Sequence, residues 1–362
     1  MSSDQAVRSI AVVGAGPGGL YLAISLKLRD PSLDVIVHER NRPDDTFGWG
    51  VVFSDQTLAN LKANDPETAA LIEAAFVHWD DIDVHMHGQT VRSGGHGFAG
   101  IGRQRLLTIL QQRARSLGVE LRFEDEVADI RALPADVIVA ADGLNSRVRN
   151  QNPRVFGVDI DVRTNKYIWL GTKQSFDAFT FAFVETPHGW IWAHAYQFEP
   201  GASTFIVECS EATWRGLGFD AMDQDQTCRA AEGLFADWLG GHALMSNARH
   251  LRGSAWLNFP RVACSNWRDG KVVLLGDAAH TAHFSIGSGT KLAFEDAIHL
   301  AGTLTAADDL DAGLAAYEAE RRVEVLKLQS AARNSTAVNS GASPRCNESR
   351  LSSKYCRAAT RH

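Results

Sequence analysis

A glycine-rich segment near the N-terminus has the residue types and spacing needed to hold a pyrophosphate. It reads GAGPGG over residues 14–19 and follows a short β-branched run at residues 8–13. Gly14 would allow a tight turn, Gly16 would let the backbone approach the phosphates, and Gly19 would let the next helix pack closely on the strand. The unpaired N–H groups at the start of that helix favour an anion. The candidate contacts in this segment are Gly14, Gly16, Pro17, Gly18 and Gly19.

An acidic residue ends the next apolar run. Residues 35–38 read VIVH, and Glu39 and Arg40 follow, with Glu39 lying 20 positions after Gly19. A carboxylate at the end of the second strand of a βαβ unit accepts hydrogen bonds from the ribose hydroxyls of a dinucleotide. A glycine-rich turn that only packs is the alternative. The order of strand, glycine motif, helix, strand and acid favours a dinucleotide site, with Glu39 and Arg40 as further contacts.

Two later segments indicate which dinucleotide is bound. Residues 136–149 read DVIVAADGLNSRVR, an apolar run that ends in Asp142 and Gly143, and residues 276–297 read GDAAHTAHFSIGSGTKLAFEDA. Together with the glycine motif, these segments resemble the FAD-dependent aromatic hydroxylases, the family that includes p-hydroxybenzoate hydroxylase. The three motifs follow in order over most of the chain, so the resemblance is specific.

The resemblance implies roles for individual residues. Asp277 would bond the ribityl chain of FAD. Gly287 and Gly289 would lie at a helix N-terminus beside the flavin pyrimidine, where the helix stabilises negative charge on the reduced ring. The segment around Asp142 would also serve NADH or NADPH as a transient co-substrate. The other implied FAD contacts are Arg103, Asp142, Gly143 and Thr290.

A predicted strand carries the candidates for the substrate side of the site. Trp190, Trp192, His194 and Tyr196 alternate along it, so their side chains would share one face. That face is either the aromatic wall of a pocket or ordinary sheet packing. His194 and Tyr196 are therefore catalytic candidates that would at most assist proton transfer.

Two further residues are assigned from their place near the motifs. His283 lies between Asp277 and Gly287 in the sequence, which makes it a third catalytic candidate in contact with substrate or flavin. Trp49, within a Gly-Trp-Gly turn, either borders the flavin ring or packs as part of a lid. The chain departs from the broad hydroxylase pattern at Phe284 and Lys291, where proline and asparagine are common.

Segments outside the shared motifs are similar to a narrower group. The resemblance is to the salicylyl-CoA 5-hydroxylases and 2-aminobenzoyl-CoA monooxygenases, and also to the violacein-pathway tryptophan hydroxylases. The GHGFAGIGR stretch at residues 95–103 favours the enzymes of CoA thioesters. The other matching segments are NKYIWLGT at 165–172, HAYQFEPGASTFIVECSE at 194–211, FGWGVVFSD at 47–55 and HFSIGSGT at 283–290.

The resemblance implies a monooxygenase that consumes NADH or NADPH and O₂. One oxygen atom would enter an activated aromatic ring through a flavin C4a-hydroperoxide, most simply at position 5 of a salicylyl-CoA or 2-aminobenzoyl-CoA type thioester. Three alternatives stay open: a hydroxylase of a free aromatic such as tryptophan or an indole, an FAD reductase of a lipid or isoprenoid, and an inactive FAD-binding scaffold. The last is suggested by the unusual residues 334–362, and the sequence shows no basic cluster for the CoA phosphate.

The elements that must position these residues predict an α/β fold with an α+β insertion. Apolar runs without alternation predict a Rossmann-like FAD-binding domain with a parallel sheet. Aromatic-rich runs between residues 160 and 260 predict an interleaved, mainly antiparallel substrate domain. The predicted division is 1–75, 101–158 and 261–333 for FAD binding, 76–100 and 159–260 for the substrate domain, and 334–362 for a disordered tail.

Composition excludes several other classes of protein. The 362 residues have a formal net charge of −7, which gives no general reason to bind nucleic acid or an anionic membrane. The five cysteines form no CxxC pair, which indicates a cytoplasmic protein without a metal site. The uncharged run at residues 9–26 contains Pro17 and is too short to span a bilayer. A monomer or homodimer is expected.

Overall fold

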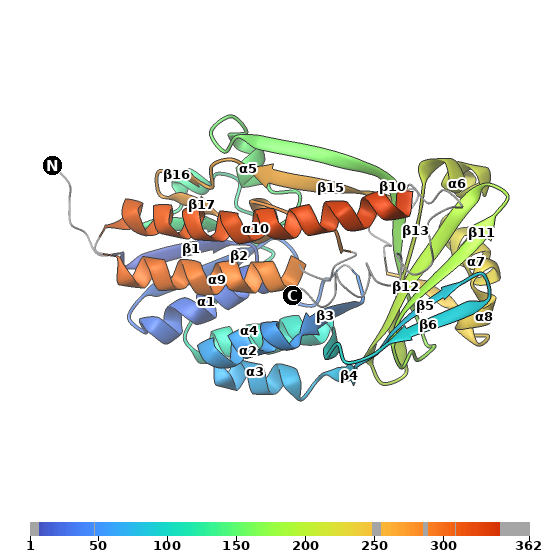
Figure 1. Cartoon of the computed structure of the whole chain (residues 1–362). Helices are drawn as coiled ribbons and strands as arrows, with labels where there is room; N and C mark the ends of the chain where they lie inside the picture. The colour runs from blue at the N-terminus through green and yellow to red at the C-terminus, as the bar shows by residue number, and fades with distance from the viewer. Residues whose placement is uncertain (1–6, 47, 248–254, 285–288, 308, 341–362) are drawn as a thin grey trace.

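The computed structural model describes residues 7–46, 48–247, 255–284, 289–307 and 309–340 of the chain. Figure 1 shows a helix-covered sheet at one end of the molecule and a large, strongly tilted sheet at the other. The predicted fold class, an α/β protein with a Rossmann-like sheet and a second, mainly antiparallel sheet, is confirmed.

The Rossmann-like sheet has six strands in the order β16-β17-β9-β1-β2-β8. Its inner pairs are parallel, and only the edge strand β16 pairs in the antiparallel sense. All four residues of β9 are buried, as expected for a parallel strand that is covered on both faces. The strands are β1 (Ser9–Val13), β2 (Asp34–Glu39), β8 (Glu120–Phe123), β9 (Val137–Ala140), β16 (Arg268–Asp269) and β17 (Val272–Leu274).

Helices cover this sheet and bring distant motifs together. The first helix, α1 (Pro17–Arg29), packs on α9 (Gly289–Ala306), and α9 in turn lies beside α10 (Leu310–Ser340) (Figure 1). A Cβ atom at Gly18 would lie 2.8 Å from Leu275 Cδ2, so the glycine permits the close approach of α1. The other helices here are α2 (Asp55–Asn64), α3 (Pro66–Glu73), α4 (Arg103–Ser116) and α5 (Arg147–Gln151).

The last described helix extends beyond the point at which the sequence pattern changes. The prediction ended the packed chain at about residue 333, whereas the helical backbone of α10 continues to Ser340. A helical backbone needs only local hydrogen bonds, so it can continue where apolar periodicity has stopped. The rest of the predicted tail, residues 341–362, lies outside the described residues.

A small three-stranded sheet, β3-β7-β4, connects the two ends of the molecule. It consists of β3 (Gly50–Ser54), β4 (Val77–Trp79) and β7 (Phe98–Gly102). The tyrosine hydroxyl of Tyr196 in the large sheet donates a hydrogen bond of 2.9 Å to the carbonyl oxygen of Gly50 in β3. The small sheet is thereby fastened to the large one.

The large sheet has eight strands, with the order β14-β10-β13-β12-β11-β5-β6 and β15 also paired with β10. All its pairs are antiparallel except β11 with β5. One face packs on α6 (Glu211–Gly216), α7 (Gln224–Leu234) and α8 (Ala236–Leu239). The strands are β5 (Ile82–Met86), β6 (Gln89–Ser93), β10 (Val158–Thr172), β11 (Phe179–Thr186), β12 (Gly189–Glu199), β13 (Ala202–Cys209), β14 (Leu244–Ser246) and β15 (Leu257–Cys264).

The register of the large sheet decides which side chains face the other end of the molecule. His194 in β12 lies opposite Ile206 in β13, and Ile206 lies opposite Trp169 in β10. Glu208 lies one step further along the same face, opposite Trp192. This face therefore carries a row of large aromatic side chains together with one histidine and one carboxylate.

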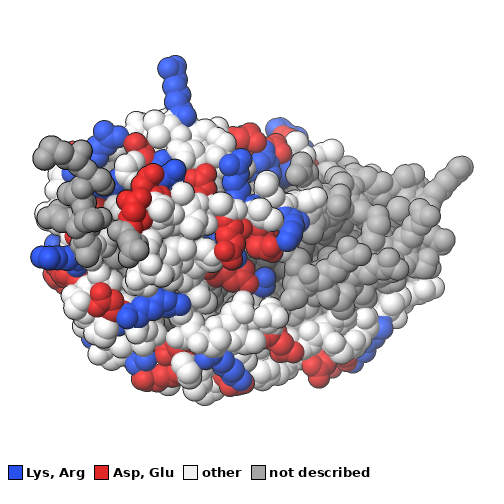
Figure 2. Space-filling view, turned by 60° about the vertical axis from the view of Figure 1, so that its left-hand side comes forward, with Lys and Arg blue, Asp and Glu red and all other residues white. Residues whose placement is uncertain are grey.

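Three further features concern the surface charges, the helices and the possible metal ligands of the described residues. On the face in Figure 2, acidic and basic side chains of the described residues are interspersed, without an extended basic area. Within the described ranges, no helix is both long enough and apolar enough to cross a bilayer. The same ranges contain no group of three or more His, Cys, Asp or Glu side chains arranged to hold a metal ion.

Candidate FAD and substrate site

The glycine turn between β1 and α1 is held by close backbone packing. Gly14 has a φ of 110°, and its N–H donates to the carbonyl oxygen of His38 at 2.8 Å. A Cβ atom at Gly14 would lie 2.3 Å from the carbonyl oxygen of Ala141, and one at Gly19 would lie 2.1 Å from that of Gly14. Both positions therefore exclude any side chain.

The middle of the same turn is open. A Cβ atom at Gly16 would meet no atom within 4 Å, although Gly16 directly precedes the first turn of α1. Pro17, the first residue of the helix, lines a pocket of about 220 Å³. The turn thus combines rigid glycines at its two ends with free space at the N-terminus of the helix, which is where a pyrophosphate would be held.

Glu39 lies directly beside this turn. Its Oε2 accepts a hydrogen bond of 2.8 Å from the backbone N–H of Ala15, and its Oε1 accepts one of 2.9 Å from the N–H of Asn41. These bonds hold the carboxylate at the end of β2, next to the place where an adenosine ribose would lie. The side chain of Arg40, the next residue, is exposed.

The Asp142-Gly143 loop after β9 forms the next part of the site. Asp142 Oδ2 accepts hydrogen bonds from the N–H groups of Arg147 at 2.8 Å and Val148 at 3.3 Å, which caps α5. Its Oδ1 is buried and has no hydrogen-bond partner among the described residues. Gly143 has a φ of 79° and free space beside its Cα.

Arg149 joins this loop to the loop that carries Asp277. Its guanidinium donates to the carbonyl oxygen of Leu144 at 2.7 Å and to that of Ala278 at 3.1 Å. The side chain is almost completely buried, so its hydrogen bonds hold two chain segments that are far apart in sequence. Leu144 and Asp277 both line the pocket as a result.

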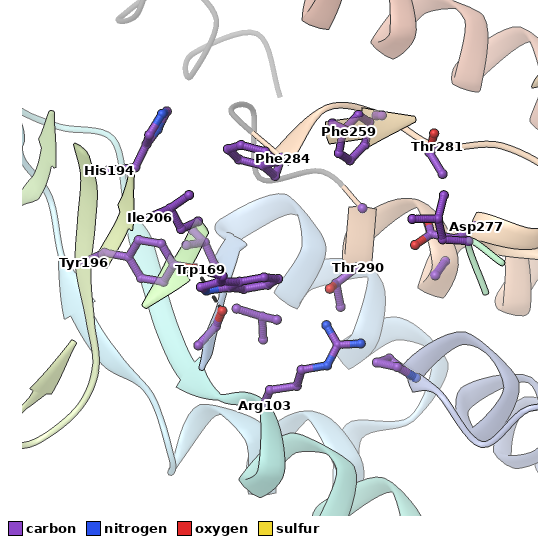
Figure 3. A pocket seen from close by; sticks show the side chains of 18 of the residues that line it. Arg103, Trp169, His194, Tyr196, Ile206, Phe259, Asp277, Thr281, Phe284 and Thr290 are labelled. Carbon is purple, nitrogen blue, oxygen red and sulfur yellow. Dashed lines mark hydrogen bonds between the residues drawn. The ribbon is translucent and has the colours of Figure 1, made fainter. Parts of the chain in front are cut away.

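Arg103 and Asp277 supply the charged groups of the pocket. Figure 3 shows Arg103 extending toward the side of the pocket where Thr290 and Asp277 lie. The Nε of Arg103 is buried and has no hydrogen-bond partner among the described residues. Enclosure by protein raises the pKa of Asp277, and the nearby charges of His280 and Arg103 only partly offset this effect. The two groups leave unused hydrogen-bonding capacity that faces the pocket.

The start of α9 completes this side of the pocket. Gly289 and Thr290 line it, and a Cβ atom at Gly289 would meet nothing within 4 Å. Gly287 lies outside the described residues, so its predicted role is not placed. Lys291 points into an ion pair of 3.0 Å with Glu295 on the same helix.

Aromatic side chains of the large sheet form the opposite wall. The pocket is lined from this sheet by Trp169, Tyr196, His194 and Ile206. Phe259 of β15 and Phe284 border it between His194 and Thr281 (Figure 3). The predicted strand face therefore faces a pocket. Tyr196 is held in place by its bond to Gly50, and burial raises its pKa, which keeps the hydroxyl neutral.

The structure separates the remaining candidates from the pocket. Trp49 is not among the described lining residues, and its ring instead lies over Gly171, where a Cβ atom would be 2.6 Å away. Trp169 in β10 lines the pocket instead. His283 lies behind Phe284, with ring centroids 4.2 Å apart, and burial lowers its pKa to about 4. His280 is paired with Asp296 at 2.7 Å and belongs to the structural framework.

Sequence reasoning missed one charged residue beside the pocket. Glu208 is fully buried in β13, and its Oε2 lies 3.5 Å from Nε2 of His194. A single carboxylate inside the otherwise apolar run STFIVEC was the available signal, because a lone charge within a buried strand is rare. Phe259 and Phe284 were also not assigned to the substrate side.

The described residues fit an FAD molecule. The open Gly16 position, the unpaired Arg103 Nε and the unpaired Asp142 Oδ1 are features that a bound dinucleotide would complete. Dinucleotides bind at the carboxyl ends of parallel strands. Glu39, the glycine turn, Asp277 and Thr290 all lie near these ends of the Rossmann-like sheet.

Comparison with protein families and curated proteins identifies this arrangement. The family model described as "FAD binding domain" matches residues 126–332. The chain is 47% identical over 336 residues to a salicyloyl-CoA 5-hydroxylase of Streptomyces sp, covering 90% of this chain and 64% of that protein. It therefore spans less than two thirds of that relative's length.

Two other relatives are matched over most of their length. The chain is 34% identical over 317 residues to a 3-hydroxy-4-methyl-anthranilyl-[aryl-carrier protein] 5-monooxygenase of Streptosporangium sibiricum, covering 86% of this chain and 84% of that protein. It is 33% identical over 329 residues to a protodeoxyviolaceinate monooxygenase of Chromobacterium violaceum, covering 88% and 85%.

Solved structures show the same fold. The tetrameric form of 2-methyl-3-hydroxypyridine-5-carboxylic acid oxygenase superposes with a TM-score of 0.76 at 21% identity, covering 98% of this chain and 96% of that one. PqsL of P. aeruginosa in complex with 2-aminobenzoylacetate superposes with a TM-score of 0.72 at 20% identity, covering 97% and 100%. The family match and the relatives above 30% identity agree with the geometry of the pocket: the chain belongs to the family of FAD-dependent aromatic hydroxylases.

Proposed function

We propose that this chain uses FAD, NADH or NADPH, and O₂ to hydroxylate an aromatic ring held as a CoA thioester, of the salicylyl-CoA or 2-aminobenzoyl-CoA type. The observation that carries the proposal is the pocket itself. Residues suited to FAD, including Arg103 and Asp277, line one side, and an aromatic wall with Trp169 and Tyr196 lines the other. An aromatic ring between these sides would lie next to the cofactor.

Bound FAD would supply the redox chemistry, since it accepts electrons from a nicotinamide and activates O₂. The protein would bind the substrate ring, orient the carbon that is attacked and keep water out. Trp169, Phe259 and Phe284 offer apolar surface for the ring. Tyr196 is fixed by Gly50 and gives that wall a rigid centre.

The charges of the pocket favour a neutral acyl group over a free carboxylate. Among the described lining residues, Arg103 carries the one guanidinium or ammonium group, and Asp277 lines the same pocket. On the sheet side, the nearest charged group is the carboxylate of Glu208 behind His194. A free aryl carboxylate would lose its hydration there without gaining a cation, whereas a thioester carbonyl carries no charge.

The named relatives point in the same direction. The Streptomyces protein is named for a CoA thioester, and the Streptosporangium protein for an anthranilyl group on an aryl-carrier protein. Both names describe aromatic acyl groups attached to a carrier. On the face drawn in Figure 2 the described residues form no extended basic area, and we propose that recognition rests on the aryl group and its thioester arm.

Hydroxylation of a free aromatic, such as tryptophan or an indole, is the second candidate. One observation in its favour is the apolar aromatic wall, which would also accept an indole ring. A second is the relative named for protodeoxyviolaceinate. We also propose a cytoplasmic location, because Cys209, Cys228 and Cys264 are buried free thiols. The state as monomer or homodimer stays a prediction from sequence.

One assay tests the proposal. FAD-loaded protein is given NADH or NADPH with salicylyl-CoA, 2-aminobenzoyl-CoA, free salicylate and tryptophan in parallel, and nicotinamide oxidation, O₂ uptake and hydroxylated product are measured. We expect stimulation and product with a thioester and at least tenfold less with free salicylate. Stimulation by tryptophan alone would favour the second candidate. A flavin-loaded sample that responds to none of the four would contradict the hydroxylase assignment.

A further inference from the structure

A buried carboxylate lies directly behind the substrate side of the pocket. Glu208 sits in β13, all eight residues of which are buried, and its own exposure is 0%. Placing a carboxylate in a protein interior is costly unless other groups neutralise it or donate to it. The apolar packing of β13 therefore does not explain why a carboxylate occupies position 208.

Only one of the two carboxylate oxygens of Glu208 accepts a hydrogen bond from the described residues. Oε1 accepts a hydrogen bond of 2.9 Å from the side-chain amide of Asn165 and lies 4.0 Å from Nε2 of His283. Oε2 lies 3.5 Å from Nε2 of His194, and no donor among the described residues reaches it at ordinary hydrogen-bond length. The unused oxygen faces the histidine that lines the pocket.

The same nitrogen of His194 has a second neighbour. Nε1 of Trp192 donates a hydrogen bond of 3.1 Å to Nε2, so Nε2 carries no hydrogen in the neutral ring. Nε2 thus lies between a donor, Trp192, and an anion, Glu208. The neutral imidazole of His194 accepts the hydrogen bond from Trp192 at Nε2. A protonated imidazole would instead direct its Nε2–H toward the carboxylate of Glu208.

We propose that Glu208 is a positioning residue that allows His194 to take up the proton of the substrate's ring hydroxyl. The inference rests on the proposed function and applies to substrates that carry such a hydroxyl. The proton leaves the hydroxyl oxygen and is held at Nε2 of His194, where Glu208 balances the new positive charge. The substrate oxygen becomes an oxyanion, which sends electron density to its para carbon, and the proton returns to that oxygen after the ring has been hydroxylated.

The other groups around Glu208 are poorly suited to this role. Burial lowers the pKa of His283 to about 4, so this ring is neutral near pH 7. Burial raises the pKa of Tyr167 to about 12, so the tyrosine is neutral as well. Arg163, whose charge acts on His283, is paired with Asp161 at 3.3 Å. His194 is the neighbour that lines the pocket, and its Nε2 lies 3.5 Å from the unused oxygen.

The charge state of Glu208 agrees with this arrangement. Burial alone would raise the pKa of Glu208, but its contact with His194 and the hydrogen bond from Asn165 help to lower that pKa below its usual value. Glu208 is thus an anion at neutral pH, ready to stabilise a proton on His194.

The test compares Glu208→Gln, which removes the charge at nearly constant shape, with Glu208→Asp, which keeps it. Glu199→Gln, an exposed carboxylate at the end of β12, is the matched control. One readout is the absorbance of bound salicylyl-CoA, which reports phenol or phenolate at equilibrium, without turnover. The others are FAD content and the pH profile of hydroxylation.

We expect salicylyl-CoA to bind as phenolate to the parent protein and as phenol to Glu208→Gln, with hydroxylation at least tenfold slower. The rising limb of the pH profile should move to lower pH, since a base without its anion holds a proton less tightly, and its plateau should fall. Glu208→Asp should restore part of the phenolate signal. FAD content should be equal in all variants, and Glu199→Gln should match the parent.

An unchanged phenolate signal and pH profile in Glu208→Gln would overturn the inference. If Glu208→Gln does not fold, Trp192→Phe takes its place: removing the competing donor should move the rising limb to higher pH, and an unmoved limb would overturn the inference. A parent protein that neither binds nor hydroxylates salicylyl-CoA would instead contradict the proposed function, and so the two failures are distinguishable.

Discussion

A Cβ atom placed on Gly19 would lie 2.1 Å from the carbonyl oxygen of Gly14. No rotation of a side chain relieves this contact, because both partners are backbone in the turn that starts α1. Gly16, between them, faces free space. The backbone contact therefore explains why position 19 is a glycine, and we propose that position 16 is a glycine because a ligand approaches it.

This difference predicts opposite behaviour of two variants. Gly19→Ala should lower the free energy of unfolding by about 3 kcal/mol, since the turn must open to admit a methyl group. Gly16→Val should change that free energy by less than about 1 kcal/mol but weaken FAD binding at least about tenfold, or about 1.4 kcal/mol. Urea unfolding and titration of the apoprotein with FAD measure the two effects. Equal loss of stability in both variants would contradict the assignment.

Removal of the pocket carboxylate should release the cofactor. Asp277→Ala removes a carboxyl group that lines the pocket. We expect flavin content to fall at least about tenfold, the loss of a charge-assisted hydrogen bond of roughly 1.5 to 3 kcal/mol. The visible absorbance of bound flavin in the purified variant, compared with that of Asp220→Ala at an exposed position, gives the result. Undiminished flavin would remove Asp277 from the site.

A buried network behind Asp277 should contribute strongly to stability. Asp296 Oδ2 accepts hydrogen bonds from Nε2 of His280 at 2.7 Å and from the N–H of Gly276 at 3.2 Å, and Oδ1 accepts one of 2.8 Å from Nε of Arg321. Asp296→Asn should lower the free energy of unfolding by about 3 to 5 kcal/mol, because the buried guanidinium of Arg321 loses the fully buried one of its two anionic partners.

The neighbouring residue supplies the control for this prediction. Glu295 also pairs with Arg321, at 3.0 Å, but is partly exposed. Glu295→Gln should cost about 1 kcal/mol or less. Urea midpoints at pH 7 compare the two variants, and similar shifts in both would show that burial of Asp296 does not decide the effect.

The pair of Asp65 and Arg113 predicts a pH dependence of stability. Burial would raise the pKa of Asp65, but hydrogen bonds from Arg113 and Thr68 lower it below its usual value. A carboxyl group with a lowered pKa in the folded state stabilises the protein fully above its unfolded pKa, about 3.9, and loses this contribution as the pH falls through the folded value.

Asp65→Asn should therefore destabilise the protein most at pH 7 and progressively less below about pH 4. Urea unfolding of both proteins at pH 7, 5, 4 and 3 measures the difference. Glu73→Gln, in the exposed pair with Lys62, should show a small effect at every pH. A difference between Asp65→Asn and the parent that grows on acidification would have the wrong sign.

The FAD half of the molecule could be predicted from sequence because its signals are local. The turn at residues 14–19 needs glycine for backbone reasons that hold in any protein with this turn, and Glu39 follows from the length of one βαβ unit. Continuous apolar runs such as β9 identify parallel strands without knowledge of their neighbours. The fold class and the cofactor were therefore available before any coordinates.

The substrate half was predicted in part. Alternation along β12 correctly placed His194 and Tyr196 on one face, since side chains alternate in every strand. The alternation of side chains does not show which other part of the protein packs against that face of the strand. Whether Trp49 or Trp169 lines the pocket depends on how β10 packs against the small sheet.

Only the tertiary structure brought Glu208 to His194. The two residues lie on neighbouring strands whose register pairs His194 with Ile206, and register depends on contacts along the whole sheet. The chain order likewise does not show that His283 packs behind Phe284, or that Arg149 ties Leu144 to Ala278. Local backbone demands determined the cofactor motif, whereas long-range register and packing decided which side chains face the substrate.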